Sequence, residues 1–147
     1  MGTLFLVARM AGRRLAIDAE QVDAVVDLGR VVPTPLAELQ VLGVTALRSR
    51  VVTVIDPARA LLLDDGWCDT PERAVITTIA GHCYAVVTEA VEDVRPLELL
   101  PPAGGLAMSS AWAGVGRGLA ECDGEALLIV DLAAVIAGAS AQQSFAA

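Results

Sequence analysis

The chain has 147 residues, enough for one domain of ordinary size or for two small lobes that share an interface. Its formal net charge of -8 and isoelectric point near 4.4 argue against nucleic acid or an anionic membrane surface as a partner, because both attract clustered positive charge. The mean hydropathy is high, +0.61, yet no uninterrupted apolar stretch approaches the ~20 residues of a membrane helix.

Two further features predict a cytoplasmic protein without direct membrane insertion. The apolar run from Thr3 to Ala8 is too short for a signal peptide and lacks a basic flank ahead of it. The odd number of cysteines, at no metal-like spacing, is typical of reduced structural thiols: Cys68, Cys83 and Cys122.

The N-terminal segment predicts a strand over 4–9, a turn at 11–13 and an antiparallel return strand over 15–17. The apolar residues between Val22 and Leu28 have a mixed periodicity. A strand throughout and a helical turn that leads into a strand both fit them, and we favour the strand. The segment from Gly29 to Pro35 carries two prolines and predicts a loop.

A central hairpin follows the loop. Two runs of aliphatic and β-branched residues, 41–47 and 51–55, flank the polar centre Arg48-Ser49-Arg50, which places an arginine pair at the tip. Asp56 and Pro57 then predict an N-cap and a first helical position. We expect this short helix to end near Leu63, before a polar, acidic connection over 64–71.

The pattern of apolar strands and turns begins again after this connection, so the chain contains an internal repeat. A shift of 69 residues without a gap aligns identical residues, among them Ala11, Gly12, Glu20 and Val22 with Ala80, Gly81, Glu89 and Val91. The second copy ends like the first. It predicts a hairpin with an Asp123-Gly124 turn, a helix from the cap Asp131 to Gly138, and a frayed tail over 139–147.

Two tandem repeats of short antiparallel strands predict a mainly β fold of two five-stranded, SH3-like barrels with short capping helices. Closing each sheet removes the exposed edges that short strands would leave. We expect one lobe over about 4–63 and the other over about 73–138. Each lobe alone would be marginally stable, so the two should share a core.

The central hairpin resembles the motif of the CheW-like adaptor family of bacterial chemotaxis, which runs Gly, two residues, Asn-Leu-Arg-Gly, an apolar strand and Ile-Asp. The matching residues are Gly43, Leu47, Arg48, Val51, Val52, Val54, Ile55 and Asp56. Ala46 stands at the family asparagine and Ser49 at the second glycine. The segments 117–124 and 127–131 resemble the second-lobe signature, and the double-barrel fold of the family agrees with the repeat.

The residues that an enzyme would need are scarce. The single histidine, His82, adjoins Cys83, and neighbouring strand residues point to opposite faces, so a cysteine–histidine dyad is not expected. Asp56 and Asp131 occupy equivalent positions before helices, where capping explains both. The acidic residues over 89–93 predict a solvated face. We expect neither a catalytic nor a metal or cofactor site.

The resemblance implies a non-catalytic adaptor that couples the cytoplasmic tip of a chemoreceptor to the regulatory domain of a CheA-type histidine kinase, with other CheW-like domains as further partners. It places the partner contact around Arg48, with candidate contact residues Leu47, Gly43, Val25, Val26 and Ser49. Val25, Val26 and Leu47 could instead belong to the hydrophobic core. Arg48 and Arg50 could instead be solvated charges at the hairpin tip, or pair with carboxylates of this chain.

Two other functions stay open. The departures at Ala46 and Ser49 fit a divergent interaction module of a pilus-motility or developmental pathway, or a competitor that keeps the kinase out of signalling arrays. A binder of small molecules, or an enzyme, in the cleft between the lobes is the third hypothesis.

Overall fold

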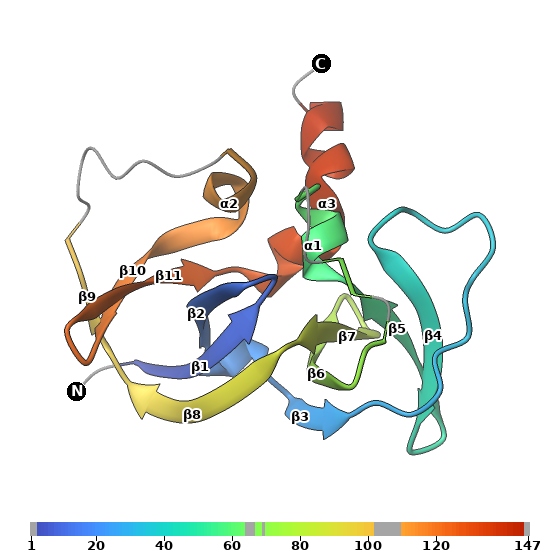
Figure 1. Ribbon diagram of the computed structural model, residues 1–147, viewed down its shortest axis with the longest axis horizontal. Helices are drawn as coiled ribbons and strands as arrows, with labels where there is room; N and C mark the ends of the chain where they lie inside the picture. Colours follow the sequence, from blue (N-terminus) through green and yellow to red (C-terminus); the bar gives the residue numbers. More distant parts are fainter. Residues whose placement is uncertain (1–2, 64–66, 69, 102–109, 146–147) are drawn as a thin grey trace.

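The computed structural model describes residues 3–63, 67–68, 70–101 and 110–145 of the chain and is mainly β. Figure 1 shows two curved sheets beside each other, with the α-helices gathered on one side of them. The strands of the first sequence repeat are β1 (Leu4–Met10), β2 (Arg13–Asp18), β3 (Ala24–Asp27), β4 (Val41–Leu47) and β5 (Arg50–Ile55). Those of the second are β6 (Arg73–Ile79), β7 (His82–Thr88), β8 (Ala90–Pro96), β9 (Glu98–Leu99), β10 (Gly116–Cys122) and β11 (Glu125–Val130).

The two sheets do not follow the two repeats. One sheet has the order β8-β1-β2-β11-β10-β9 and the other has the order β3-β6-β7-β5-β4. The lobes predicted over 4–63 and 73–138 therefore do not coincide with the sheets, because the first hairpin of each repeat joins the sheet of the other. Parallel pairing causes the exchange: β2 lies beside β11, and β5 lies beside β7. One of the two sheets also has six strands rather than the expected five.

Each sheet is closed by a segment that bends from one edge toward the other. In the six-stranded sheet, β8 pairs with β1 and the chain continues into β9, which pairs with β10. In the five-stranded sheet, β3 pairs with β6, and Val32 farther along the same segment forms a bridge with Val44 of β4. The SH3-like double barrel expected from the sequence is therefore confirmed.

The structure confirms the 69-residue spacing of the sequence repeat. β1 and β6 begin at Leu4 and Arg73, and β2 and β7 begin at Arg13 and His82, each 69 residues apart. The turns within the hairpins are two residues long with both φ angles positive, at 11–12, 48–49, 80–81 and 123–124. Such turns match the right-handed twist of the strands that they connect.

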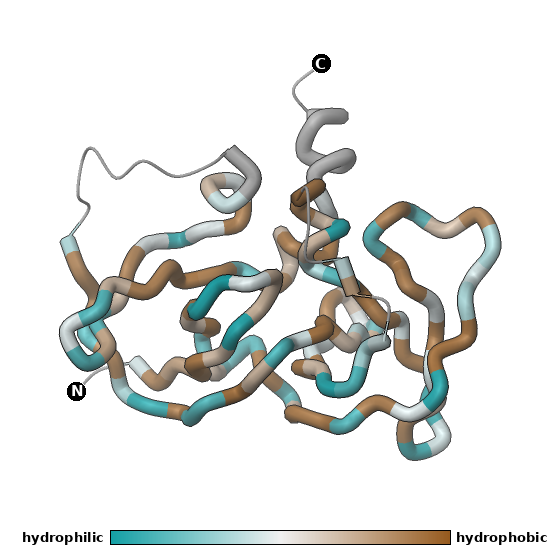
Figure 2. The backbone as a smooth tube through the Cα atoms, viewed as in Figure 1, coloured by the Kyte–Doolittle hydropathy of each residue, from teal (hydrophilic) through white to brown (hydrophobic). Residues whose placement is uncertain are grey.

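Three apolar clusters fill the molecule. One lies within each barrel, around Val7 and Leu127 in the six-stranded sheet and around Val52 and Ala85 in the other. The third and largest lies between the sheets and takes residues from both repeats and the helices: Leu6, Met10, Leu15, Ile17, Ile55, Ala60, Leu61, Val75, Val86, Trp112, Val115, Leu128, Val130, Leu132 and Val135. Figure 2 shows the resulting alternation of hydrophobic and hydrophilic residues along the strands. The shared core expected from the small size of the repeats is present.

The helices are mostly short, and the 3-10 helix η1 (Ala19–Gln21) lies in the connection from the six-stranded sheet to the five-stranded one. The α-helices are α1 (Pro57–Ala60), α2 (Ser110–Val115) and α3 (Leu132–Phe145). The region between Val22 and Leu28, for which we favoured a strand throughout, begins after η1 and is a strand only over β3. No helix in the described part of the chain is long and apolar enough to cross a membrane.

The predicted tail over 139–147 is helical as far as Phe145, the last described residue. Gly138 has a φ of 78° and interrupts α3 where we expected its end, but the chain then resumes the helix. The residues after Gly138 include alanine and glutamine, which are good helix formers even without an amphipathic pattern. Their small and polar character is therefore compatible with a helix.

Candidate partner-binding surface

The two-residue turn Arg48-Ser49 joins β4 to β5 and presents both side chains to solvent. The φ angles are 49° for Arg48 and 68° for Ser49, a left-handed conformation that glycine and asparagine adopt more readily than arginine or serine. The family glycine at position 49 is thus explained by the backbone of the turn. In Figure 2 the tip of this hairpin is hydrophilic and projects away from the body of the barrel.

Arg48 and Arg50 form no ion pair or side-chain hydrogen bond with any of the described residues. Several other arginines do form ion pairs with carboxylates: Arg14, Arg59, Arg73, Arg95 and Arg117. The alternative that the tip arginines pair with carboxylates of this acidic chain therefore fails among the described residues. Two unpaired guanidinium groups remain available to donate hydrogen bonds to a partner.

An apolar residue that we did not single out lies beside the arginines. Val51 is 72% exposed and pairs with the exposed Ala46 across the hairpin. Leu47 is half-buried and packs against the cluster inside the barrel, together with Val26. Neighbouring strand residues point to opposite faces, so Val51 points outward where Val52 is buried.

Gly43 is buried and has a structural role in the hairpin. An added Cβ at this position would lie 2.2 Å from the carbonyl oxygen of Val32 and 2.9 Å from the Cα of Pro33. The register of β4 against β5 also shifts between Val41 and Gly43. The glycine therefore permits the approach of the segment that closes the barrel.

Val25 and Val26 lie on β3 and face opposite sides of the sheet. Val26 packs toward the inner cluster, whereas Val25 is 40% exposed and pairs with Val75 of β6. In the sheet order β3 and β4 occupy opposite ends. The segment after β3 meets β4 through the bridge between Val32 and Val44, and not through Val25. The structure thus brings Leu47, Arg48 and Ser49 together at one hairpin and adds Val51, whereas Val25 lies on a different strand.

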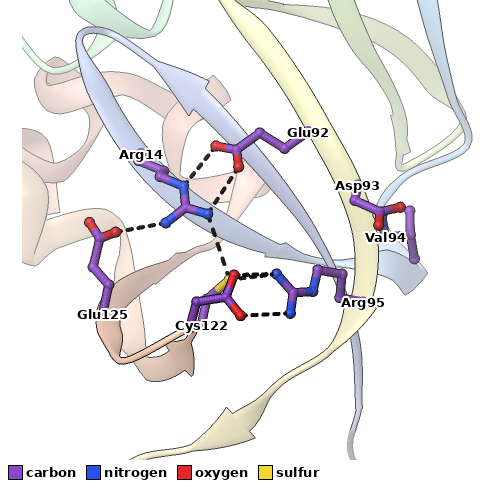
Figure 3. A network of polar contacts seen from close by, with 8 residues as sticks. Arg14, Glu92, Asp93, Val94, Arg95, Cys122 and Glu125 are labelled. Carbon is purple, nitrogen blue, oxygen red and sulfur yellow. Dashed lines mark hydrogen bonds and ion pairs between the residues drawn. The ribbon is translucent and has the colours of Figure 1, made fainter.

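A polar network on the six-stranded sheet contrasts with the unpaired arginines. Arg14 of β2 donates to both carboxylate oxygens of Glu92 on β8, at 2.7 and 2.9 Å, and to Glu125 on β11 at 2.7 Å. Figure 3 shows these side chains converging from three strands. Glu92 is exposed, in agreement with the solvated face predicted over 89–93, but strand order places Arg14 within reach of it and the two side chains pair.

Arg95 completes the network through a bidentate contact with Asp123, at 2.8 and 3.0 Å, and its Nη1 also lies 3.3 Å from the Sγ of Cys122. The hydrogen bonds from Arg14 and Arg95 lower the pKa of Glu92 and of Asp123, respectively, below the usual carboxyl values. The same contacts raise the pKa of both arginines. This network ties the hairpin tip of β10 and β11 to β8.

The predicted caps are confirmed. Asp56 accepts a hydrogen bond from the backbone N–H of Ala58 at 3.0 Å, and Asp131 accepts one from that of Ala133 at 3.0 Å. Gln21 of η1, which we did not predict, donates to Asp131 at 2.9 Å and accepts from the N–H of Leu132 at 3.0 Å. Both aspartates are therefore engaged in capping.

No cluster of three or more histidine, cysteine, aspartate or glutamate residues in the described part of the chain is arranged to hold a metal ion. His82 is exposed, and its ring lies 6.5 Å from that of Tyr84. Cys83 packs instead against the cluster inside the barrel.

Comparison with known proteins agrees with the double barrel. The structure superposes on the crystal structure of the scaffolding protein TtCheW from Thermoanaerobacter tengcongensis with a TM-score of 0.70, covering 89% of this chain and 90% of that chain. The two sequences are 21% identical, so this likeness shows a shared fold. No curated protein sequence matches the chain significantly. The family model of the CheW-like domain matches residues 4–140, and the chain therefore belongs to the CheW-like family.

Proposed function

We propose that this chain is a non-catalytic, cytoplasmic adaptor that couples a chemoreceptor tip to the regulatory domain of a CheA-type histidine kinase. The observation that carries the proposal is the β4–β5 hairpin tip, where Arg48 is exposed, unpaired among the described residues and held on a two-residue turn. Membership of the CheW-like family supports the adaptor class.

The hairpin tip combines the features of a protein-binding hot spot. Arginine side chains are enriched in such sites because they combine several hydrogen-bond donors with an apolar stem. The exposed Val51 and Ala46 supply apolar area beside the charge. We infer that an acidic partner surface contacts Arg48 and that Val51 packs at the rim of this contact.

The test is a binding titration of the purified chain against a chemoreceptor cytoplasmic fragment and against a CheA-type regulatory domain. Arg48→Glu should weaken binding by about 2 kcal/mol or more if Arg48 is a hot spot. Arg9→Glu makes the same change of charge at an exposed position of the other sheet, and should bind like the native chain. Equal affinity of the Arg48→Glu and native chains, with intact folding, would remove Arg48 from the site.

A second candidate is a divergent interaction module that serves a pilus-motility or developmental pathway, or a competitor that keeps the kinase out of arrays. The observation that favours it is Ser49, a non-glycine residue with a φ of 68° on the turn that carries Arg48. A pull-down from lysate of the source organism separates the two functions. Recovery of both a receptor and a histidine kinase supports coupling, whereas recovery of the kinase alone supports the competitor.

A further inference from the structure

A cleft lies where residues 70–73, at the start of β6, meet the end of β7, away from the β4–β5 hairpin tip. We call it the junction cleft. It has a volume of about 370 Å³, and the charged and hydroxyl residues around it come from several elements: Asp27, Asp56, Thr70, Glu72, Arg73, Thr88 and Glu89. Four of these seven are carboxylates and one is a guanidinium, in a chain whose net charge is already -8.

Part of this charge is committed to the fold. Both carboxylate oxygens of Asp56 accept backbone N–H groups, Oδ1 from Ala58 at 3.0 Å and Oδ2 from Cys68 at 2.8 Å. Asp27 pairs with Arg73 at 3.3 Å. The carboxylates left to meet a ligand are those of Glu72 and Glu89.

Glu89 is held in position at the rim of the cleft. One of its carboxylate oxygens, Oε1, accepts the backbone N–H of Gly12, and its own N–H donates to the carbonyl oxygen of Arg9 at 2.8 Å. The second oxygen, Oε2, has no hydrogen bond with any described residue. Glu72 is exposed, and its carboxylate likewise contacts none of them.

Thr88 provides an independent sign of a ligand. The residue is among those that line the cleft and is 4% exposed, and its Oγ1 is buried without a hydrogen-bond partner among the described residues. Buried hydroxyl groups are almost always satisfied, because an unsatisfied one loses its hydration without replacement. A valine would fill the same space without this cost, so the hydroxyl calls for a partner.

We propose that the junction cleft binds an organic cation through a primary ammonium or guanidinium group. Such a group carries several N–H donors and no acceptor, which complements Glu89 Oε2, the Glu72 carboxylate and Thr88 Oγ1. An anion would be repelled by the carboxylates. A metal ion is disfavoured, because no three carboxylate, histidine or cysteine side chains of the described residues converge suitably. The group belongs either to a free small amine or to a lysine or arginine side chain of a partner protein.

The test is an NMR titration of the full chain with n-butylammonium and with agmatine, and with n-butanol as the neutral probe of equal length. The ammonium and guanidinium probes should shift the amide signals of Gly12 and Glu89 saturably, and butanol should not. Glu89→Gln should weaken the affinity about tenfold. Glu98→Gln, an exposed change on β9 of the six-stranded sheet, is the control and should bind like the native chain.

Thr88→Val separates a ligand-binding hydroxyl from a structural one. We expect this variant to melt at or above the native temperature and to bind the cations more weakly.

A peptide with one lysine, compared with its norleucine counterpart, distinguishes the two sources of the cationic group, a free amine and a partner side chain. Binding tighter than that of butylammonium identifies a partner side chain, and equal or weaker binding identifies a free amine. Native affinity in both Glu89→Gln and Thr88→Val, or no saturable shift up to about 50 mM probe, would overturn the proposal. Such a failure would leave the coupling role of Arg48 untouched, because the two sites share no residue.

Discussion

Gly43 lies directly against the carbonyl group of Val32, whose oxygen would be 2.2 Å from a Cβ at position 43. The contact accompanies the reciprocal backbone hydrogen bonds between Val32 and Val44, at 2.8 and 2.9 Å, that close the five-stranded barrel. We therefore predict that Gly43→Ala destabilises the fold by roughly 2–4 kcal/mol, measured by urea denaturation, because the chain must move away from the new methyl group.

Gly29→Ala is the control for this change. Gly29 has open space around its Cα, with no atom within 4 Å of an added Cβ. We expect a change in the free energy of unfolding within about 0.5 kcal/mol. If Gly43→Ala kept native stability but lost partner binding, Gly43 would be a contact residue rather than a structural one.

Ser49→Gly is expected to stabilise the hairpin by about 0.5–1 kcal/mol. Serine at a φ of 68° is strained, and glycine adopts this conformation without a steric penalty. Ser49→Ala keeps the strain and should give no gain. The measurement is the urea midpoint of the three chains, and a loss of stability in Ser49→Gly would show that the serine hydroxyl contributes more than the strain costs.

The sequence predicts these elements well where local signals are strong. The hairpin around Arg48, the caps at Asp56 and Asp131 and the 69-residue repeat each depend on residues close together in the chain, and each is present in the structure. The exchange of hairpins between sheets depends on parallel pairing of β2 with β11 and of β5 with β7. The same sequence repeat results whether the hairpins stay within one lobe or cross to the other. The sequence pattern therefore could not predict this parallel pairing.

The same reasoning explains the mixed result for the candidate site. Resemblance to the family selected Gly43, Leu47 and Arg48, but it does not say which face each residue occupies. The structure assigns Gly43 to barrel closure and turns Leu47 inward. Val51 was missed because Val51 and Val52 are both apolar, so the alternation of exposed and buried positions was hidden in a continuous run.

The ion pairs of Arg14 and Arg95 predict a loss of stability in acid. The arginines lower the pKa of Glu92 and Asp123 in the folded chain. A carboxyl whose folded pKa lies below its unfolded value of about 4 stabilises the fold above that pH, and the contribution disappears as the pH falls through the folded pKa. The double variant Arg14→Gln, Arg95→Gln should therefore lose less stability than the native chain as the pH falls below about 4.

The measurement for this acid effect is the urea midpoint as a function of pH. Arg48→Gln is the matched control, since Arg48 pairs with none of the described carboxylates and its loss should leave the pH dependence unchanged. Because the pairs are partly exposed, added salt should reduce the difference between the native chain and the double variant. An identical acid profile in the native chain and the double variant would contradict the role of the network.

Gln40 should prove to be the residue that fixes α3 on the body of the protein. It is 5% exposed, and its Nε2 donates to the carbonyl oxygens of Ile136 at 3.1 Å and Ala137 at 3.3 Å, just before the interruption at Gly138. Gln40→Met preserves the volume but removes the donor, so we predict a loss of about 1–3 kcal/mol. Hydrogen exchange should show faster opening of α3 amides such as that of Val135.

Leu39→Met is the control, because it changes an exposed residue at the adjacent position. Its free energy of unfolding should stay within about 0.5 kcal/mol of that of the native chain. Unchanged α3 protection in Gln40→Met would mean that apolar packing against α1 suffices to hold the helix.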